Sequence, residues 1–176
     1  QALIDLGFDD VLDDYVLTSN IIGITSISFQ GTGSSCNNCI GSFNNSKIKN
    51  MVGIEDFKSL KQLYVGVTKL NNINLSQNIN LKELTIHYNK LKKINLSKNT
   101  LLEYLNISAN PFEIETVDIS NNVNLKALFL GGLGGRGRYG EEYDGGQGII
   151  YQNYESNITY LDVSNNPKLN RLGISY

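Results

Sequence analysis

Apolar residues recur along this chain with a period of 21 residues, and the polar residues between them recur in the same order. The clearest unit is Leu81 to Leu101, LKELTIHYNKLKKINLSKNTL, with apolar residues at positions 1, 4, 6, 11, 14 and 16. The unit Leu60 to Asn80 matches it nearly position for position, and the unit Leu102 to Asn124 follows with two residues added. Such a unit cannot bury its apolar residues alone, so the repeat predicts a solenoid whose coils cover one another.

Within each unit the residues follow L-x-x-L-x-L-x-x-N-x-L, which is the signature of leucine-rich repeats. Positions 4 and 6 are apolar, and because the residues of a strand alternate sides, positions 3, 5 and 7, Ala127 among them, should face outward. The predicted fold is a leucine-rich repeat solenoid of the α/β class, curved, right-handed and mostly parallel β, with a concave sheet. In register, Leu84 should lie between Leu63 and Leu105.

The other half of each unit begins with Ile-Asn-Leu-Ser-x-Asn at position 14, and this alternation predicts a second short strand on the convex side. These segments start at Ile73, Ile94, Val117 and, slightly altered, Leu161. The first unit differs, because apolar residues recur at steps of three from Ile48 to Leu60. That spacing favours turns or a short helix.

Asparagine repeats at two positions. At position 19 it gives the column Asn78, Asn99, Asn122 and Asn166, and at position 9 it gives Asn89 and Asn110, with Thr68 interrupting. A buried amide without partners costs about 1 to 3 kcal/mol, so the columns predict ladders of hydrogen bonds to turn backbone in the same and neighbouring coils. The position-9 ladder should be weaker at Thr68.

Spacing also divides the chain into parts. Residues 1–20 predict a helical cap over the first coil, since a solenoid exposes apolar groups at its ends. Residues 21–176 form the solenoid, and broken spacing places loop insertions near 31–45 and 131–157. The last half coil, from Leu169, should leave its apolar edge uncovered, which suggests a continuing chain, a partner or another segment over this end.

Composition narrows the possible partners. The net charge is -2 with 18% charged residues, so no basic stripe suits nucleic acid or an anionic membrane surface. No apolar run approaches the ~20 residues of a membrane span, and the first residues lack the plan of a signal peptide. The chain is therefore either intracellular or a mature form.

The two cysteines, Cys36 and Cys39, lie in the order Cys-Asn-Asn-Cys within the first insertion. A zinc site needs four ligands, and the only histidine, His87, is on a different coil. A local disulfide, two free thiols and a redox motif are the alternatives. The surrounding Gly, Ser and Asn favour a loop over the helix that usually follows a redox motif.

Catalytic chemistry has little support in the sequence. There is no fixed carboxylate pair, no Ser-His-Asp or Cys-His order, and no phosphate loop in the run GGLGGRG, which lacks the Lys-Ser/Thr of a P-loop. We expect no enzyme activity, no catalytic residue, no metal and no cofactor. His87 is interpreted as a surface side chain.

Binding has better candidates. On the concave face, Tyr64, His87, Tyr104 and Phe129 combine contact area with few rotamers, although they could merely stack across neighbouring strands. The longer insertion combines tyrosine with glycine, as adaptable contact loops do, or else folds over the solenoid edge or stays disordered. Its candidate contacts are Arg136, Arg138, Tyr139, Tyr143, Tyr151 and Tyr154.

With its repeats aligned, the chain resembles bacterial 21-residue leucine-rich repeat proteins, including some internalins and secreted or surface proteins of gliding bacteria. The resemblance covers Ile24 to Ile174 and is carried by LKELTIHYNKLKKINLSKN and ITYLDVSNNPKL. The segment ALIDLGFDDVLDDYVLTSN, followed by VGIEDFKSL, also resembles the head of secreted repeat domains. The long fourth-unit insertion and the short array depart from the family.

The resemblance implies a secreted or cell-surface setting and no enzymatic residues, and it strengthens the interpretation as a mature chain. This setting is consistent with a Cys36–Cys39 disulfide. The expected function is an extracellular recognition module that binds a protein partner through the concave sheet and the inserted loops. The alternative is a carbohydrate-binding or adhesion module that uses the Tyr/Gly-rich insertion on a polysaccharide. The uncapped carboxy-terminal edge is a further place for association.

Overall fold

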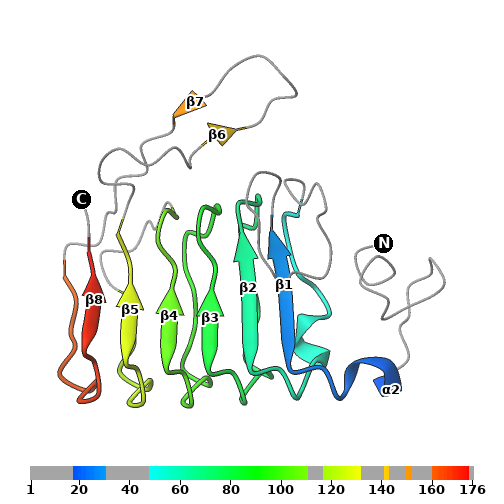
Figure 1. Ribbon diagram of the computed structural model, residues 1–176, viewed down its shortest axis with the longest axis horizontal. Helices are drawn as coiled ribbons and strands as arrows, with labels where there is room; N and C mark the ends of the chain where they lie inside the picture. The colour runs from blue at the N-terminus through cyan, green and yellow to red at the C-terminus, as the bar shows by residue number, and fades with distance from the viewer. Residues whose placement is uncertain are drawn as a thin grey trace.

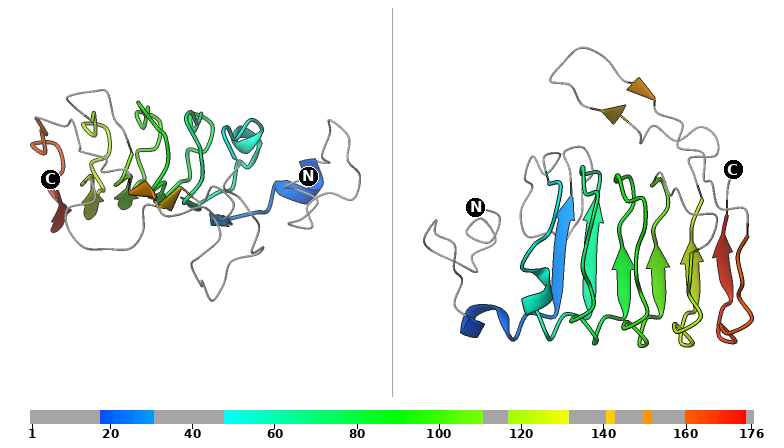
Figure 2. Two further views of the ribbon diagram at one scale, coloured as in Figure 1. Left: turned by 90° about the horizontal axis from the view of Figure 1, so that it is seen from above. Right: turned by 180° about the vertical axis from the view of Figure 1, so that it is seen from behind.

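The computed structural model describes residues 18–30, 48–110, 117–131, 141–142, 150–151 and 160–174. Within these residues, six parallel strands form one sheet in chain order, so that each coil lies beside the coil before it (Figure 1). The strands are β1 (Ser26–Gln30), β2 (Gln62–Gly66), β3 (Glu83–Thr85), β4 (Tyr104–Asn106), β5 (Ala127–Phe129) and β8 (Arg171–Gly173). Seen from above, the strands follow one side of the molecule and the turns follow the other (Figure 2).

The register of the sheet confirms the leucine-rich repeat solenoid. Leu84 pairs with Leu63 on one side and with Leu105 on the other, and the column continues through Leu128 to Leu172. From Leu63 to Leu128 these side chains are buried between the sheet and the turns. The core is therefore a row of stacked leucines, each covered by its neighbours in the adjacent coils.

The convex side corrects one prediction. In the described residues, the segments that begin at Ile73, Ile94, Val117 and Leu161 contain turns and no strand. The polar side chain at position 15 explains this, because Asn74 Oδ1 accepts a hydrogen bond from Ser76 N at 3.1 Å, and the later coils repeat this Asx turn. The alternation of apolar and polar residues thus reflects a turn. In the first unit, the 3-10 helix η2 (Ile54–Asp56) agrees with the spacing of three.

The asparagine ladder at position 19 is present, with a direction that the sequence did not indicate. Asn99 Nδ2 donates to Leu75 O at 3.1 Å and to Asn78 O at 3.0 Å, and both acceptors belong to the preceding coil. Asn78, Asn122 and Asn166 repeat this pattern. Their amides make no bond to their own coil, contrary to the prediction, and their Oδ1 atoms have no partner among the described residues.

The position-9 column adds a second ladder under the end of the sheet. Asn110 Nδ2 donates to Ile86 O at 2.7 Å, and its Oδ1 accepts from Leu91 N at 3.0 Å. Thr68 joins this column, because its hydroxyl donates to Asn89 Oδ1 and accepts from Leu70 N at 3.3 Å. The expected weak point is thus bridged by the threonine hydroxyl.

The chain leaves the sheet through left-handed backbone in three consecutive coils. Val67, Tyr88 and Ala109, all at position 8, have φ values of 54°, 52° and 54°. Non-glycine residues rarely adopt this conformation, and a β-branched residue does so least of all. Bonds between coils hold it in place, as Val67 N donates to His87 O at 3.1 Å and Ala109 N donates to Gly131 O at 2.9 Å.

Parts of the predicted organisation fall outside the described residues. Residues 1–17 do, so the amino-terminal cap stays a prediction, although the short helix α2 (Thr18–Ile21) places Ile21 in the core. Cys36 and Cys39 also lie outside, and their disulfide stays a prediction. The longer insertion contributes a described pair of antiparallel strands, β6 (Glu141–Glu142) and β7 (Ile150–Tyr151), which the sequence analysis did not anticipate.

Replacing Leu84 by alanine should destabilise the protein by about 2 to 5 kcal/mol, because the cavity would lie inside the leucine column. Leu172 occupies the same position in the last coil but is half exposed, so Leu172→Ala should cost about 1 kcal/mol or less. Urea unfolding followed by circular dichroism gives both values. Equal losses for the two variants would contradict the burial gradient.

Replacing Asn99 by aspartate should cost about 3 kcal/mol or more at neutral pH. The carboxylate would set an oxygen against the carbonyls of Leu75 and Asn78, which now receive two N–H groups. The matched control is Asn121→Asp, an exposed position on the next coil, which should change stability by less than about 0.5 kcal/mol. A small loss of stability for Asn99→Asp in the same unfolding assay would mean that the ladder does not stabilise the fold.

Candidate binding surface on the sheet

The outward side of the six-stranded sheet, here called the sheet face, carries the side chains at positions 3, 5 and 7 of each coil. The four aromatic or imidazole side chains predicted there are partly buried and partly accessible. The structure joins them into two pairs on adjacent coils. Tyr64 meets His87, and Tyr104 meets Phe129.

The first pair shares a hydrogen bond of 2.6 Å between Tyr64 Oη and His87 Nε2, with the ring centroids 5.3 Å apart and nearly perpendicular. The ring of Tyr88 lies 5.1 Å from the imidazole on its other side. Gly66 makes this arrangement possible, since a Cβ there would lie 2.7 Å from His87 Nε2 and 2.9 Å from the Tyr64 ring. The glycine is required for close approach by two side chains, not for a turn.

Burial determines the charge of the His87 imidazole. Desolvation lowers the pKa of His87 from 6.5 to about 4, so the imidazole is neutral at pH 7. The prediction of an ordinary surface histidine therefore understates its burial. A neutral imidazole can accept a hydrogen bond at one nitrogen and donate at the other, whereas the cation can only donate.

The second pair brings the Tyr104 and Phe129 ring centroids to 5.6 Å with an interplanar angle of 42°. Phe129 lies over Gly173 in the next strand, where a Cβ would come within 2.5 Å of its ring. Gly173 thus leaves room for this ring, as Gly66 leaves room for the first pair. Ala127 was expected on the exposed face but is buried, because the register sets it between Tyr104 and Arg171.

A polar strip lies between the two pairs. Thr85 and Asn106 face each other across β3 and β4 and remain partly accessible. Asn106 Oδ1 accepts hydrogen bonds from Ser108 N at 3.2 Å and from Ser108 Oγ at 2.6 Å, which fixes the amide plane. The sheet face therefore combines two rigid aromatic pairs with short, oriented polar groups. The rings stack across strands, as one alternative predicted, while part of each stays accessible.

Charge at the edge of the sheet is largely compensated. Glu103 Oε2 lies 2.6 Å from Lys126 Nζ, and its Oε1 lies 3.7 Å from Lys82 Nζ. The hydrogen bond from Lys126 lowers the pKa of Glu103. Such exposed ion pairs add little stability, but they leave the beginning of strands β3 to β5 without a strong net field. The local field therefore does not strongly attract a highly charged ligand.

The candidates in the longer insertion are not assembled into the site by the described residues. Tyr151 is described only as backbone of β7, where it pairs with Glu141. Arg136, Arg138, Tyr139, Tyr143 and Tyr154 lie outside the described residues. The longer insertion begins after β5 and the shorter one begins after β1, so both begin at the same end of the parallel sheet. Their part in binding stays a prediction.

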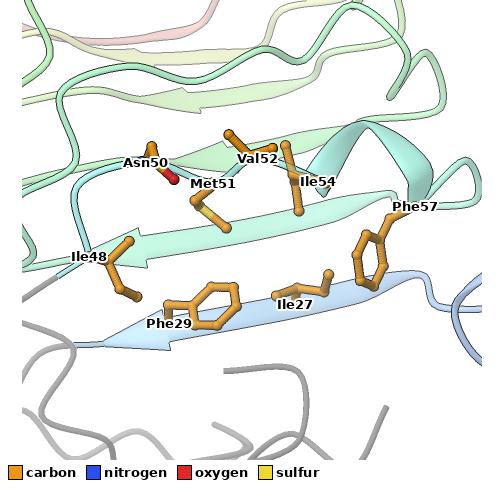
Figure 3. Close-up of a pocket in the computed structure, with 9 residues that line it drawn as sticks. Ile27, Phe29, Ile48, Asn50, Met51, Val52, Ile54 and Phe57 are labelled. Atoms are coloured by element: carbon orange, nitrogen blue, oxygen red, sulfur yellow. The ribbon is translucent and has the colours of Figure 1, made fainter. Parts of the chain in front are cut away.

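The first coil contains a cavity of about 140 Å³ between β1 and the segment 48–57. Figure 3 shows Phe29, Met51, Ile54 and Phe57 around it, with Asn50 at one side. Its lining is almost wholly apolar, so it lacks the convergent polar groups that orient substrates. We interpret it as loose packing where the first coil differs from the regular repeat.

Comparison with protein-family models finds no match, and comparison with curated proteins finds none either. Solved structures do match. One is an internalin, InlF of Listeria monocytogenes, with a TM-score of 0.61 and 21% identity over 98% of this chain and 41% of that chain. The solenoid of this chain has the fold of this internalin. The functional domain of InlJ from the same organism gives a TM-score of 0.51 with 23% identity, over 90% of this chain and 36% of that one.

The internalin-like solenoid thus spans about two fifths of the structures that it matches. The InlJ domain includes a cysteine ladder. The present chain has only two cysteines, close together in one segment, and its described coils repeat asparagine in an internal column.

In the described part of this internalin-like chain, the His, Cys, Asp and Glu residues form no group of three or more able to hold a metal ion. Among the same residues, none of the helices has the length and apolarity to cross a bilayer. The sheet face is the candidate binding surface of the described residues.

Burial of His87 predicts a pH dependence of stability. Its pKa of about 4 in the folded state lies below the ordinary imidazole value of 6.5, so the unfolded chain binds the proton more readily between these values. The contribution of the neutral imidazole to the free energy of unfolding is therefore fully present above pH 6.5 and is lost as the pH falls toward 4. Because the ring is partly accessible, we expect about 2 kcal/mol in all, less than the full shift would give.

Urea unfolding of the wild type and of His87→Gln at pH 7.0 and 4.5 measures this effect. Glutamine cannot titrate but can still bond to the Tyr64 hydroxyl. The wild type should lose more stability than the variant on acidification, while all carboxylates contribute equally to both proteins. Parallel losses would mean that the imidazole is not desolvated. As His87 is the only histidine, its NMR titration gives an independent value.

Proposed function

We propose that this chain is an extracellular recognition module that binds a protein partner through its sheet face. The observation that carries the proposal is the pair of aromatic clusters, Tyr64–His87 and Tyr104–Phe129, each seated over a glycine and each partly accessible. Aromatic residues dominate the binding energy of protein interfaces when they are held rigidly near the centre. A solenoid sheet supplies that rigidity.

The polar groups of the sheet face suit the same purpose. Thr85 and Asn106 lie between the clusters, and Asn106 is already oriented by Ser108. Oriented groups lose little entropy when a partner binds. The neutral His87 adds no charge that would have to be desolvated. An interface with aromatic anchors and few charges at its centre is typical of protein partners.

The setting and the inserted segments extend the proposal. The internalin-like fold and the resemblance to secreted repeat proteins support a cell-surface or secreted location. The two insertions begin after β1 and β5, which are four strands apart, or about 19 Å at a strand spacing of about 4.8 Å. Segments leaving there would flank the part of the sheet face that carries both clusters.

Replacing Phe129 by alanine should weaken partner binding at least about tenfold, because it removes the ring seated over Gly173. Tyr64→Ala should have a similar effect, whereas Tyr64→Phe, which keeps the ring, should have a smaller one. Tyr160→Ala is the matched control, since Tyr160 is an exposed tyrosine outside the sheet. Circular dichroism and thermal unfolding would first confirm that each variant folds.

The partner itself can be captured by a photo-crosslinking residue at Thr85, with the same residue at the exposed convex position Lys98 as the control. A protein that crosslinks at Thr85 alone supports the proposal and supplies the ligand for affinity measurements. Equal crosslinking at both positions would contradict it. Replacing residues 136–152 by a short Gly-Ser link tests the insertion separately. Binding on a glycan array that disappears with this deletion would favour the carbohydrate alternative.

A further inference from the structure

Three consecutive coils carry unfavourable backbone at position 8, where the chain leaves the sheet face. Val67, Tyr88 and Ala109 have φ values of 54°, 52° and 54°, a left-handed conformation that is strained for residues with a Cβ and most of all for a β-branched one. Glycine adopts it without strain, and the sequence places glycine at position 8 of two other coils, as Gly31 and Gly132. Since glycine would meet the same backbone requirement, the side chains of Val67 and Tyr88 need a reason of their own.

The left-handed backbone brings the Tyr88 side chain to the outward side of the sheet. Successive residues of a strand face opposite sides, so in regular backbone the residue after His87 would point inward. Instead, the ring centroids of His87 and Tyr88 lie 5.1 Å apart at an interplanar angle of 74°, which puts both rings on the same side. The imidazole therefore contacts Tyr64 and Tyr88, and the first aromatic pair extends to a third ring.

Val67 lies beside this cluster on the preceding coil. Its N–H donates to His87 O at 3.1 Å, which holds it against the backbone of the histidine. Val67 and Tyr88 are both partly accessible, whereas Ala109, with the same backbone conformation, is 2% exposed. Val67 and Tyr88, here called the rim, thus form an accessible step beyond the ends of β2 and β3 (Figure 1).

Packing inside the chain explains only part of this choice. The contact with the imidazole stabilises Tyr88 in its strained backbone, because edge-to-face ring pairs are favourable. Val67 is neither in the buried core of the described residues nor among the partly buried apolar residues that pack against it. Burial therefore offsets little of the strain at this valine. Strain that is kept without such compensation is typical of ligand-binding sites.

We propose that the rim is part of the binding surface, where Val67 and Tyr88 contact an apolar side chain of the protein partner. This inference rests on the proposed function of the sheet face and names one of its contacts. The rim is continuous with the Tyr64–His87 pair, because Tyr88 and Val67 both touch His87. The imidazole is neutral at pH 7, so the contact carries no charge of its own. An apolar group suits such a surface, whereas a charged group would lose hydration against valine and aromatic rings.

The test replaces the three position-8 residues by glycine, one at a time, and measures stability and binding in each variant. The probe is the protein captured by crosslinking at Thr85, and calorimetry gives its affinity. Val67→Gly should raise the melting temperature by about 2 °C or more, because it removes strain. The same variant should weaken binding about fivefold or more, because it removes an apolar contact. A merely structural role for Val67 would not combine a gain in stability with a loss of affinity.

Three further variants complete the series. Tyr88→Gly should weaken binding at least as much as Val67→Gly, with little change in melting temperature, since the lost contact with His87 offsets the relieved strain. Ala109→Gly is the matched control, because it changes the same backbone at a buried position, and it should bind as the wild type does. Val67→Thr keeps the branching and the strain but adds a hydroxyl, so it should weaken binding about threefold at an almost unchanged melting temperature. Wild-type affinity in Val67→Thr would contradict an apolar contact.

The outcomes separate this inference from the proposed function. If Phe129→Ala weakens binding while Val67→Gly and Tyr88→Gly bind as the wild type does, the rim is not part of the site, and the sheet face remains the binding surface. If Phe129→Ala and Tyr64→Ala also leave binding unchanged, or if no protein is captured at Thr85, the proposed function fails and the rim inference fails with it. A glycan that binds the wild type but not Val67→Gly would assign the rim to a sugar and overturn the inference in a third way.

Discussion

The structure depends on the fact that no coil can satisfy itself. Each coil is too thin to bury its own leucines, and its turn carbonyls have hydrogen-bonding capacity left after closing their own turns. The asparagine ladder uses the remaining capacity of these carbonyls, because Asn99 donates to Leu75 O and Asn78 O of the preceding coil. These bonds help to fix the spacing between the two coils. Burial of the adjacent leucines at that spacing then supplies the apolar contribution to stability.

The same spacing determines the candidate binding surface. Parallel strands about 4.8 Å apart bring side chains at equal positions into contact, so large groups on adjacent coils must stack unless a neighbour is small. Gly66 and Gly173 are those small neighbours, and they allow Tyr64, His87 and Phe129 to settle across the sheet. Packing within the sheet thus produces rings with fixed orientation and an accessible side. Rigid recognition requires this property, and it follows here from the repeat itself.

The sequence predicted what depends on period and left undetermined what depends on contacts between coils. Leucine spacing was sufficient for the register from Leu63 to Leu172, since one displaced residue would turn the apolar side chains outward. Alternation failed on the convex side because Asx turns produce the same pattern as a strand. Val67 gave no sign of its left-handed backbone, which is held by His87 in the next coil. Burial of His87 likewise depends on Tyr64 and Gly66, 23 and 21 residues earlier.

The asparagine ladder is also directional. Every described side-chain amide at position 19 donates to the coil before it, so each coil completes the turn of its predecessor and offers acceptors to its successor. Among the described residues the Oδ1 atoms of these asparagines have no hydrogen-bond partner, so there the side-chain amides are held through their N–H groups. Loss of one asparagine would therefore weaken the junction with the preceding coil and leave its other face intact. Stability is consequently set junction by junction along the array.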